Sequence, residues 1–251
     1  MEKSQEQERS PQLYNKSNYI ILPGRTHGKH EFEDLFVAKY RLRSDDLVRK
    51  VAKNLGLRAM NTRSGLFGRA FIGEIDWNNA LKLNLSLKGE TLSPRRFIDF
   101  KELLEFGLNG GAVYDGTGKK IKDLRVIKVV YYEIFAKKDP WRGEWLDAYF
   151  EENDIKGEYS ISYNHYLSGK ELKPGISEPL QDCLRIKEYL FHLRFNGQGL
   201  PIKEENFNYF PPYNNSVAWF YADSGRAILS CDGDPSDTDS SLGVRHARKK
   251  F

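Results

Sequence analysis

The densest group of chemically active side chains lies near the C-terminal end of the chain. Eight consecutive residues there include four aspartates, Asp232, Asp234, Asp237 and Asp239. Carboxylates at alternate positions suit the oxygen preference of calcium. The segment is not an EF-hand, because Pro235 lies inside it and the glycine and closing glutamate of that loop are missing. We expect no obligatory cofactor, and we keep a structural calcium site as the alternative to a plain acidic loop.

The histidines and cysteines give weaker indications of chemistry. His27 and His30 are three positions apart in a glycine-containing loop, without a cysteine or a third histidine nearby, so a zinc site is not predicted. Two cysteines, Cys183 and Cys231, are too few for a disulfide scaffold. Cys231 alternates with Leu229, which predicts a small buried side chain. A bridge between the two cysteines stays open.

Small and apolar residues recur at every second position in parts of the segment 216–248. Such alternation is typical of half-buried strands, with one face on a core and the other turned outward. The core-facing set is Ala218, Phe220, Ala222, Ala227, Leu229, Cys231, Leu242 and Val244. The outward-facing set is Trp219, Tyr221, Asp223, Gly225, Arg226, Ile228, Ser230, Asp232, Gly233, Asp234, Ser236, Asp237 and Asp239.

The composition of this segment is unusual. Between Phe220 and Ala247 there is no Lys, Glu, Gln, Met or Trp, although Lys and Glu are common elsewhere in the chain. Most of the residue types present can be reached by changing only the adenines of an asparagine codon. The alternative is a chance gap in a short loop region rich in Asp and Ser.

The segment resembles the variable region of the target proteins of diversity-generating retroelements, especially the microbial and archaeal-virus members. The residues that carry the resemblance are Ser216, Val217, Ala218, Phe220, Ala222, Ser224, Ala227, Leu229, Cys231, Pro235, Leu242, Gly243, Val244, Arg245, Ala247 and Arg248. Segments 22–28, 92–97 and 142–148 also look like parts of that family. The resemblance implies a C-type-lectin-like fold, the fold of formylglycine-generating enzymes, whose variable positions are rewritten by adenine-directed mutagenesis and form a ligand-binding surface.

The function expected from this resemblance is ligand binding, not catalysis. The outward-facing set would contact an unidentified protein or surface ligand, with Trp219, Tyr221 and Arg226 foremost because such residues dominate interface energetics. The aspartates favour a cationic partner. Arg245 is expected to be structural, in a salt bridge under the strands. No spacing supports Ser–His–acid or Cys–His catalysis.

Two alternatives belong to other classes of function. An oxidase of the formylglycine-generating type requires paired cysteines that hold copper, and the C-terminal region offers only Cys231. A nucleic-acid binder would use the basic tail, which contains Arg245, Arg248, Lys249 and Lys250. Such binders usually concentrate basic residues on one face, and a net charge of +4 is mild, so nucleic acid is not the expected partner.

The composition fits a folded protein. Of the 251 residues, 39% are hydrophobic and 13% aromatic, enough for a packed core. No apolar run approaches the roughly 20 residues of a membrane span. The polar N-terminal stretch has no apolar segment of the kind found in a secretory signal. We therefore expect a soluble protein made in the cytoplasm, and display on a virion or cell stays open.

The elements that must position these residues are mixed. Apolar spacing and caps predict helices over 44–55, 93–108, 123–137 and 177–193. Over 77–87 the alternating leucines leave strand and helix open, and we favour the helix. An apolar run that ends at Pro23 predicts a strand over 19–22, and alternation predicts a hairpin of 145–151 with 159–165 and strands in 216–248. Residues 1–17 are expected to be a disordered tail and 18–251 one domain. The fold class is α+β, with several helices before a mostly antiparallel C-terminal sheet.

Overall fold

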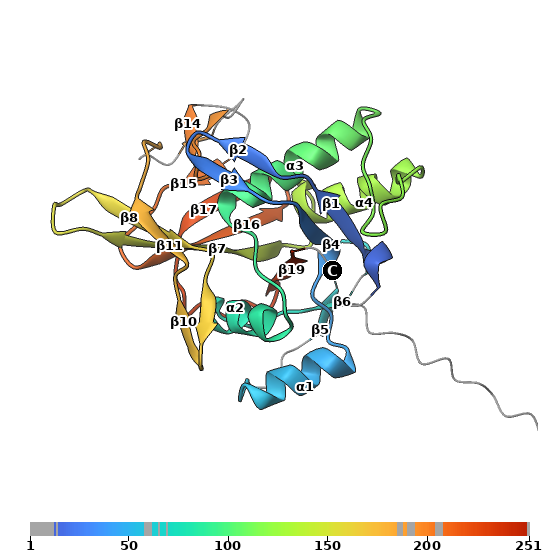
Figure 1. The fold of residues 1–251 in the computed structure, drawn as a ribbon, viewed down its shortest axis with the longest axis horizontal. Helices are drawn as coiled ribbons and strands as arrows, with labels where there is room; N and C mark the ends of the chain where they lie inside the picture. The colour runs from blue at the N-terminus through green and yellow to red at the C-terminus, as the bar shows by residue number, and fades with distance from the viewer. Residues whose placement is uncertain are drawn as a thin grey trace, which may run out of the picture.

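The computed structural model describes residue 13 and residues 15–57, 62–64, 66–68, 70–184, 188–189, 194–203 and 208–249. Within these residues the protein is α+β, with four α-helices and mostly antiparallel sheets (Figure 1). Most of the predicted N-terminal tail, residues 1–12 and 14, lies outside them. The end of that prediction is wrong, because Leu13 is buried and Lys16–Asn18 forms a short 3-10 helix, η2.

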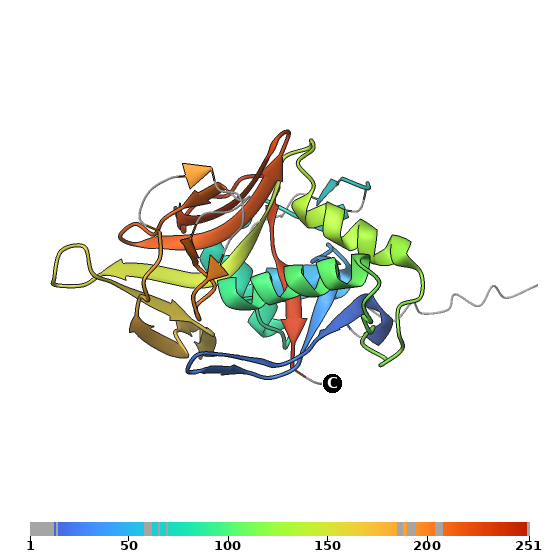
Figure 2. The same cartoon turned by 90° about the horizontal axis from the view of Figure 1, so that it is seen from above.

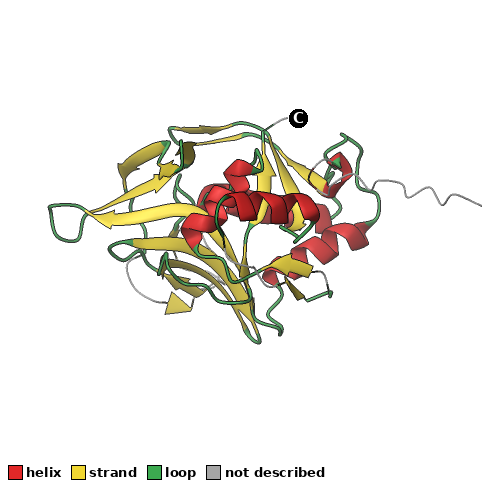
Figure 3. Ribbon diagram, turned by 90° about the horizontal axis from the view of Figure 1, so that it is seen from below, coloured by secondary structure: helices red, strands yellow, loops and turns green. Residues whose placement is uncertain are grey.

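The principal sheet has eight strands, with β11-β8-β7-β16-β17-β15-β12 in order and β18 beside β7. Its pairs are antiparallel except β15 with β17 and β18 with β7. The strands are β7 (Arg142–Glu152), β8 (Tyr159–Tyr163), β11 (Ile176–Pro179), β12 (Glu188–Tyr189), β15 (Asn208–Phe210), β16 (Ser216–Asp223), β17 (Arg226–Gly233) and β18 (Leu242–Gly243). The predicted hairpin is confirmed as β7 and β8, whose tip projects beyond the helices (Figure 3).

A second sheet joins the two ends of the described chain. It has three antiparallel strands, β1 (Tyr19–Leu22), β4 (Leu35–Arg41) and β19 (Arg245–Arg248), with β4 in the middle. The remaining strands form two-stranded pairs: β2 (Arg25–His27) with β3 (His30–Phe32), β5 (Thr62–Ser64) with β6 (Ala70–Ile72), β9 (Tyr166–Ser168) with β10 (Glu171–Lys173), and β13 (Arg194–Phe195) with β14 (Pro201–Lys203).

The helices begin where capping residues predict. They are α1 (Asp46–Asn54), α2 (Trp77–Ser86), α3 (Pro94–Leu108) and α4 (Leu124–Phe135). Asp76, Ser93 and Asp123 each accept a hydrogen bond from a backbone N–H in the first turn of the helix they precede, as N-caps do. The predicted cap of α1, Ser44, is wrong by one residue, because the Asp45 carboxylate accepts the bond from Val48 N at 3.0 Å.

The helix predicted over 177–193 is wrong where the structure describes it. Ser177 lies in strand β11, and the segment from Leu180 to Leu184 is not helical. Residues 185–187 and 190–193 lie outside the described residues. Leu180, Cys183 and Leu184 nevertheless pack against the core. Their apolar spacing reflects contact with that core from an irregular chain, an ambiguity expected of short apolar runs.

Helices cover both faces of the principal sheet. In Figure 1, α3 and α4 lie above β7, β16 and β17, and α2 and α1 lie below; Figure 2 shows α3 and α4 from above. The Phe220 ring of β16 lies 5.0 Å from that of Phe97 in α3 and 5.1 Å from that of Phe135 in α4. On the opposite face Trp145 packs in a cluster with Trp77 of α2. The central strands are therefore buried on two sides.

Candidate functional site

The C-terminal segment forms a hairpin, a loop and two closing strands. In the hairpin β16–β17, Phe220 pairs with Leu229 and Tyr221 with Ile228. Gly225 occupies the turn with a φ of 89°, a left-handed conformation that glycine adopts without a steric penalty. The loop 234–241 then leads to β18, which pairs with β7, and β19 completes the second sheet.

The eight residues predicted to face the core all do so. None exceeds 3% exposure. Those of the hairpin, with Leu146, Ala148 and Phe150 of β7, belong to the cluster that packs beneath α3 and α4. Leu242 and Val244 belong instead to the cluster around α2. Burial of such side chains contributes roughly 1.5–3 kcal/mol each, so this face fixes the path of the backbone.

The outward-facing prediction is wrong for five of the thirteen candidate residues. Ile228 and Ser230 are 1% exposed, and Asp223, Tyr221 and Gly233 are also buried. These residues do lie on the second face of the sheet. Part of that face packs on α2, because Trp145, Val217 and Trp219 belong to one cluster with Trp77. Tyr221 lies against the rings of Trp141 and Trp219. The five buried residues cannot contact a ligand without rearrangement of their surroundings.

Trp219 is the one large side chain of the second face that keeps part of its surface exposed along β16. Its ring stacks on Trp145 at 5.5 Å with an angle of 22° between the planes. Trp141 and Tyr221 lie 6.0 Å and 5.2 Å from it. Four aromatic rings thus form one group, in which Trp145 is buried while Trp141 and Trp219 are half-buried.

The loop 234–241 is held by its own aspartates and by the segment before α2. Trp77 N donates to Pro235 O at 3.2 Å, and Glu74 N donates to Asp239 O at 3.3 Å. Three carboxylates each accept a backbone N–H two residues further on, at 2.8 Å for Asp234, 3.0 Å for Asp237 and 2.7 Å for Asp239. Such turns set the loop conformation without burying the carboxylates.

The exposed candidates therefore concentrate in the loop and at the hairpin turn. Asp234, Ser236 and Asp239 are exposed, and Asp232 and Asp237 are half-buried. Hydrogen bonds from Ser236 hold the pKa of the Asp234 carboxyl below its usual value, so it is charged at neutral pH. At the turn Gly225 and Arg226 are exposed, and the Arg226 guanidinium pairs with Asp223.

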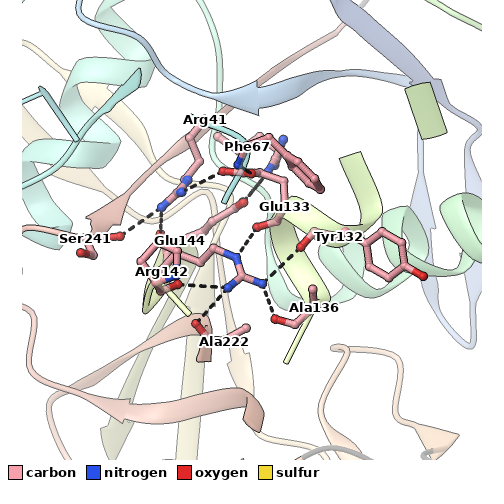
Figure 4. A network of polar contacts seen from close by, with 12 residues as sticks. Arg41, Phe67, Tyr132, Glu133, Ala136, Arg142, Glu144, Ala222 and Ser241 are labelled. Atoms are coloured by element: carbon pink, nitrogen blue, oxygen red, sulfur yellow. Dashed lines mark hydrogen bonds and ion pairs between the residues drawn. The ribbon is translucent and has the colours of Figure 1, made fainter. Parts of the chain in front are cut away.

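A buried ion network anchors the segment to the fold (Figure 4). Arg245 pairs with Glu144 of β7, with Nε 2.9 Å from Oε2, and both side chains are at most 5% exposed. This confirms the structural role predicted for Arg245. Arg41 pairs with Glu133 at 3.3 Å and donates to Ser241 O at 3.0 Å. Burial lowers the pKa of Arg41 to about 10, which still leaves it charged at neutral pH.

Arg142 is a structural residue of this network that the sequence did not indicate by spacing. Its guanidinium donates to the carbonyls of Tyr132, Glu133 and Ala136 at the C-terminal end of α4, and to Ala222 O in β16 (Figure 4). It thereby adds hydrogen bonds to the C-terminal end of α4, where the carbonyls of the last turn lack a full set of partners inside the helix, although Tyr132 O also accepts Ala136 N at 3.1 Å. The only sequence signal was its place in the segment 142–148.

The part of the chain that the structure describes contains no assembled site for a metal ion and no disulfide. No three His, Cys, Asp or Glu side chains converge there on a point that could hold a metal ion. His27 bonds to Asp99 at 2.9 Å, and His30 bonds to Tyr163 at 3.2 Å. Cys183 and Cys231 are free thiols, and burial raises the pKa of Cys231.

Comparison with protein-family models, with curated proteins and with solved structures found no match to this chain. Among the described residues, no helix has the length and apolar character needed to cross a membrane.

Proposed function

We propose that the protein binds a ligand, a protein or a surface component, through its C-terminal loop and hairpin turn, and that this surface is diversified by adenine-directed retroelement mutagenesis. The proposal includes a C-type-lectin-like fold. The α+β architecture and the antiparallel C-terminal sheet agree with that fold and do not distinguish it from other α+β folds.

One observation carries the proposal: the loop 234–241, with exposed side chains, follows directly on strands whose core-facing residues are buried. The core-facing residues and the Arg245–Glu144 pair fix the strands, while the loop bonds to the scaffold mainly through backbone atoms. Surface substitutions usually change stability by no more than about 0.5 kcal/mol. Side chains of such a loop can be exchanged while the backbone stays in place.

The burial found on the second face reduces the contact surface. The proposed contacts are Trp219, Gly225, Arg226, Asp232, Asp234, Ser236, Asp237 and Asp239. Tyr221, Ile228 and Ser230 become supports of this surface instead of contacts. Because Arg226 already neutralises Asp223, the loop carries the acidic charge that favours a cationic partner.

The DNA around the gene tests the diversification directly. We expect a reverse-transcriptase gene nearby and a near-copy of the codons for residues 216–248 that differs only at adenines. The differences should fall in codons for the exposed positions and spare the eight core-facing ones. A neighbourhood without such a copy would contradict diversification and leave simple ligand binding.

A pair of displayed libraries tests the binding surface. One library varies Arg226, Asp232, Asp234, Ser236, Asp237 and Asp239; its control varies Tyr221, Ile228, Ser230 and Gly233. Selection against lysozyme as a test protein should yield folded binders from the first library. The control should lose folded protein before selection. Equal yields of folded protein from both would show that the second face is not a support.

A further inference from the structure

A cavity on another part of the molecule carries chemistry that the proposed binding surface does not use. It has a volume of about 240 Å³ and opens to solvent between β3, the start of β4, the first turn of α3 and the C-terminal end of β19. Its lining includes Glu31, Phe32, Leu35, Glu90, Arg96 and Lys249. None of these residues belongs to the proposed contact surface.

Glu90 is held in place by its backbone. Its N–H donates to Ala247 O at 2.7 Å, and its carbonyl accepts Ala247 N at 2.9 Å, in an isolated bridge to β19. The carboxylate is half-buried, and among the described residues none forms a hydrogen bond or an ion pair with it. Burial raises the pKa of Glu90 above its usual value, and the charges of Lys249 and Arg96 act in the opposite direction without outweighing it.

The cations of the same cavity interact with other groups, although the Nη1 atom of Arg96 has no hydrogen-bond partner among the described residues. Arg96 is 3% exposed, donates to Glu33 O at 2.8 Å and faces Asp99 at 3.8 Å. Lys249 pairs with Glu33 at 2.9 Å. Glu31 is exposed, and no ion pair with a described residue neutralises it. The lining carries three carboxylates, Glu31, Glu33 and Glu90, against two cations, Arg96 and Lys249, so its net charge is negative.

The geometry points to a site for a small primary amine, whose ammonium group binds Glu90 while its alkyl chain lies against Phe32 and Leu35. A singly charged organic cation fits better than a divalent metal ion, because Arg96 and Lys249 would repel the higher charge more strongly. An ammonium group donates three hydrogen bonds, and a charge-assisted bond to a carboxylate is among the stronger polar contacts in proteins.

A titration with matched four-carbon probes tests this site on the full chain. Butylamine, butanol and butanoate are added at low salt, and the backbone amide resonances of Glu90, Leu35 and Ala247 are followed by NMR. Butylamine should saturate these shifts with a Kd on the order of millimolar, as expected for a small ligand with one charged contact. Butanol and butanoate should bind at least tenfold more weakly.

The variant Glu90→Gln keeps the shape of the side chain and removes its charge. It should bind butylamine at least tenfold more weakly than the wild type. The matched control Glu158→Gln removes one charge from the exposed tip of the β7–β8 hairpin and should bind like the wild type. Because the backbone of Glu90 makes the bridge to β19, the Gln variant should fold, which its thermal transition checks.

Three results would overturn the amine site. They are equal affinity of butylamine for the wild type and Glu90→Gln, tighter binding of butanoate than of butylamine, and shifts in the wild type that do not saturate. None of these results bears on the C-terminal loop, so failure of the amine site and failure of the proposed function are distinguishable.

Discussion

The hairpin β16–β17 and the loop 234–241 belong to one segment of the chain and contain similar residue types, yet their side chains differ in exposure to solvent. The hairpin is covered on both faces, so Ile228 on one face is as inaccessible as Leu229 on the other. The loop crosses the second face and keeps Asp234, Ser236 and Asp239 exposed. Residue type therefore does not decide which positions can recognise a ligand; the layer in which they lie does.

The largest effect should come from breaking the anchor beneath both parts. Glu144→Ala leaves the buried Arg245 without its carboxylate, and loss of one partner of a buried pair costs about 3–5 kcal/mol. Urea unfolding measures this loss. The control, Arg226→Ala, breaks a pair whose arginine side chain is 51% exposed and should cost about 1 kcal/mol or less. Similar costs for the two variants would mean that the network does not anchor the segment.

The next largest effect should come from truncating a side chain on either face of strand β17. Ile228→Ala and Leu229→Ala each remove a large aliphatic side chain that is 1% exposed. Both should lower the free energy of unfolding by about 3 kcal/mol, the middle of the range for such core truncations. Urea unfolding of the two variants side by side measures the difference. A cost below about 0.5 kcal/mol for Ile228→Ala alone would restore the second face as a free surface.

These two faces also mark the limit of prediction from sequence. Alternation placed Ala218, Phe220 and Leu229 on the core because period two is a local property of a strand. It could not reveal that Tyr221 and Ile228 are buried as well, since the period of a strand carries no information on what packs against its second face. Tyr221, for example, lies 5.7 Å from the ring of Trp141, which is far away in the sequence.

The helices show the same division between local and distant information. Ser93 and Pro94 predicted the start of α3 correctly, because a cap and a first-turn proline act within a few residues. Ser177 precedes an equally regular apolar spacing, yet it lies in β11, paired with Ser162 of β8. The pairing partner, which the local pattern does not contain, decided that structure. Arg142 was missed for a similar reason, since its acceptors lie in α4 and β16.

A buried histidine in the closing strand, His246 of β19, should make the free energy of unfolding depend on pH, whereas an exposed loop residue should not. Burial lowers the pKa of His246 from 6.5 to about 4, so the folded protein holds it neutral while the unfolded chain protonates it. The free energy of unfolding is therefore unaffected by this histidine above pH 6.5, and it decreases as the pH falls from 6.5 toward 4, because only the unfolded chain binds the proton there. Between pH 6.5 and pH 5 this loss is about 1.5 kcal/mol.

Urea unfolding at several pH values checks this dependence in the wild type and in His246→Gln. The glutamine variant should lose that part of the slope, whereas Asp234→Asn in the exposed loop should keep it. Identical slopes for the wild type and His246→Gln would mean that the histidine is not buried in its neutral form.

The smallest effect on stability should come from the loop itself. Asp237→Asn removes a charge but keeps an oxygen that can accept the N–H of Asp239, so the free energy of unfolding should change by no more than about 0.5 kcal/mol. Its consequence should appear in binding instead. Once a cationic ligand is known, the variant should weaken its affinity, and the weakening should shrink as salt screens the charge. A large loss of stability from this substitution would mean that the loop side chains stabilise the fold, as the buried side chains of the hairpin do.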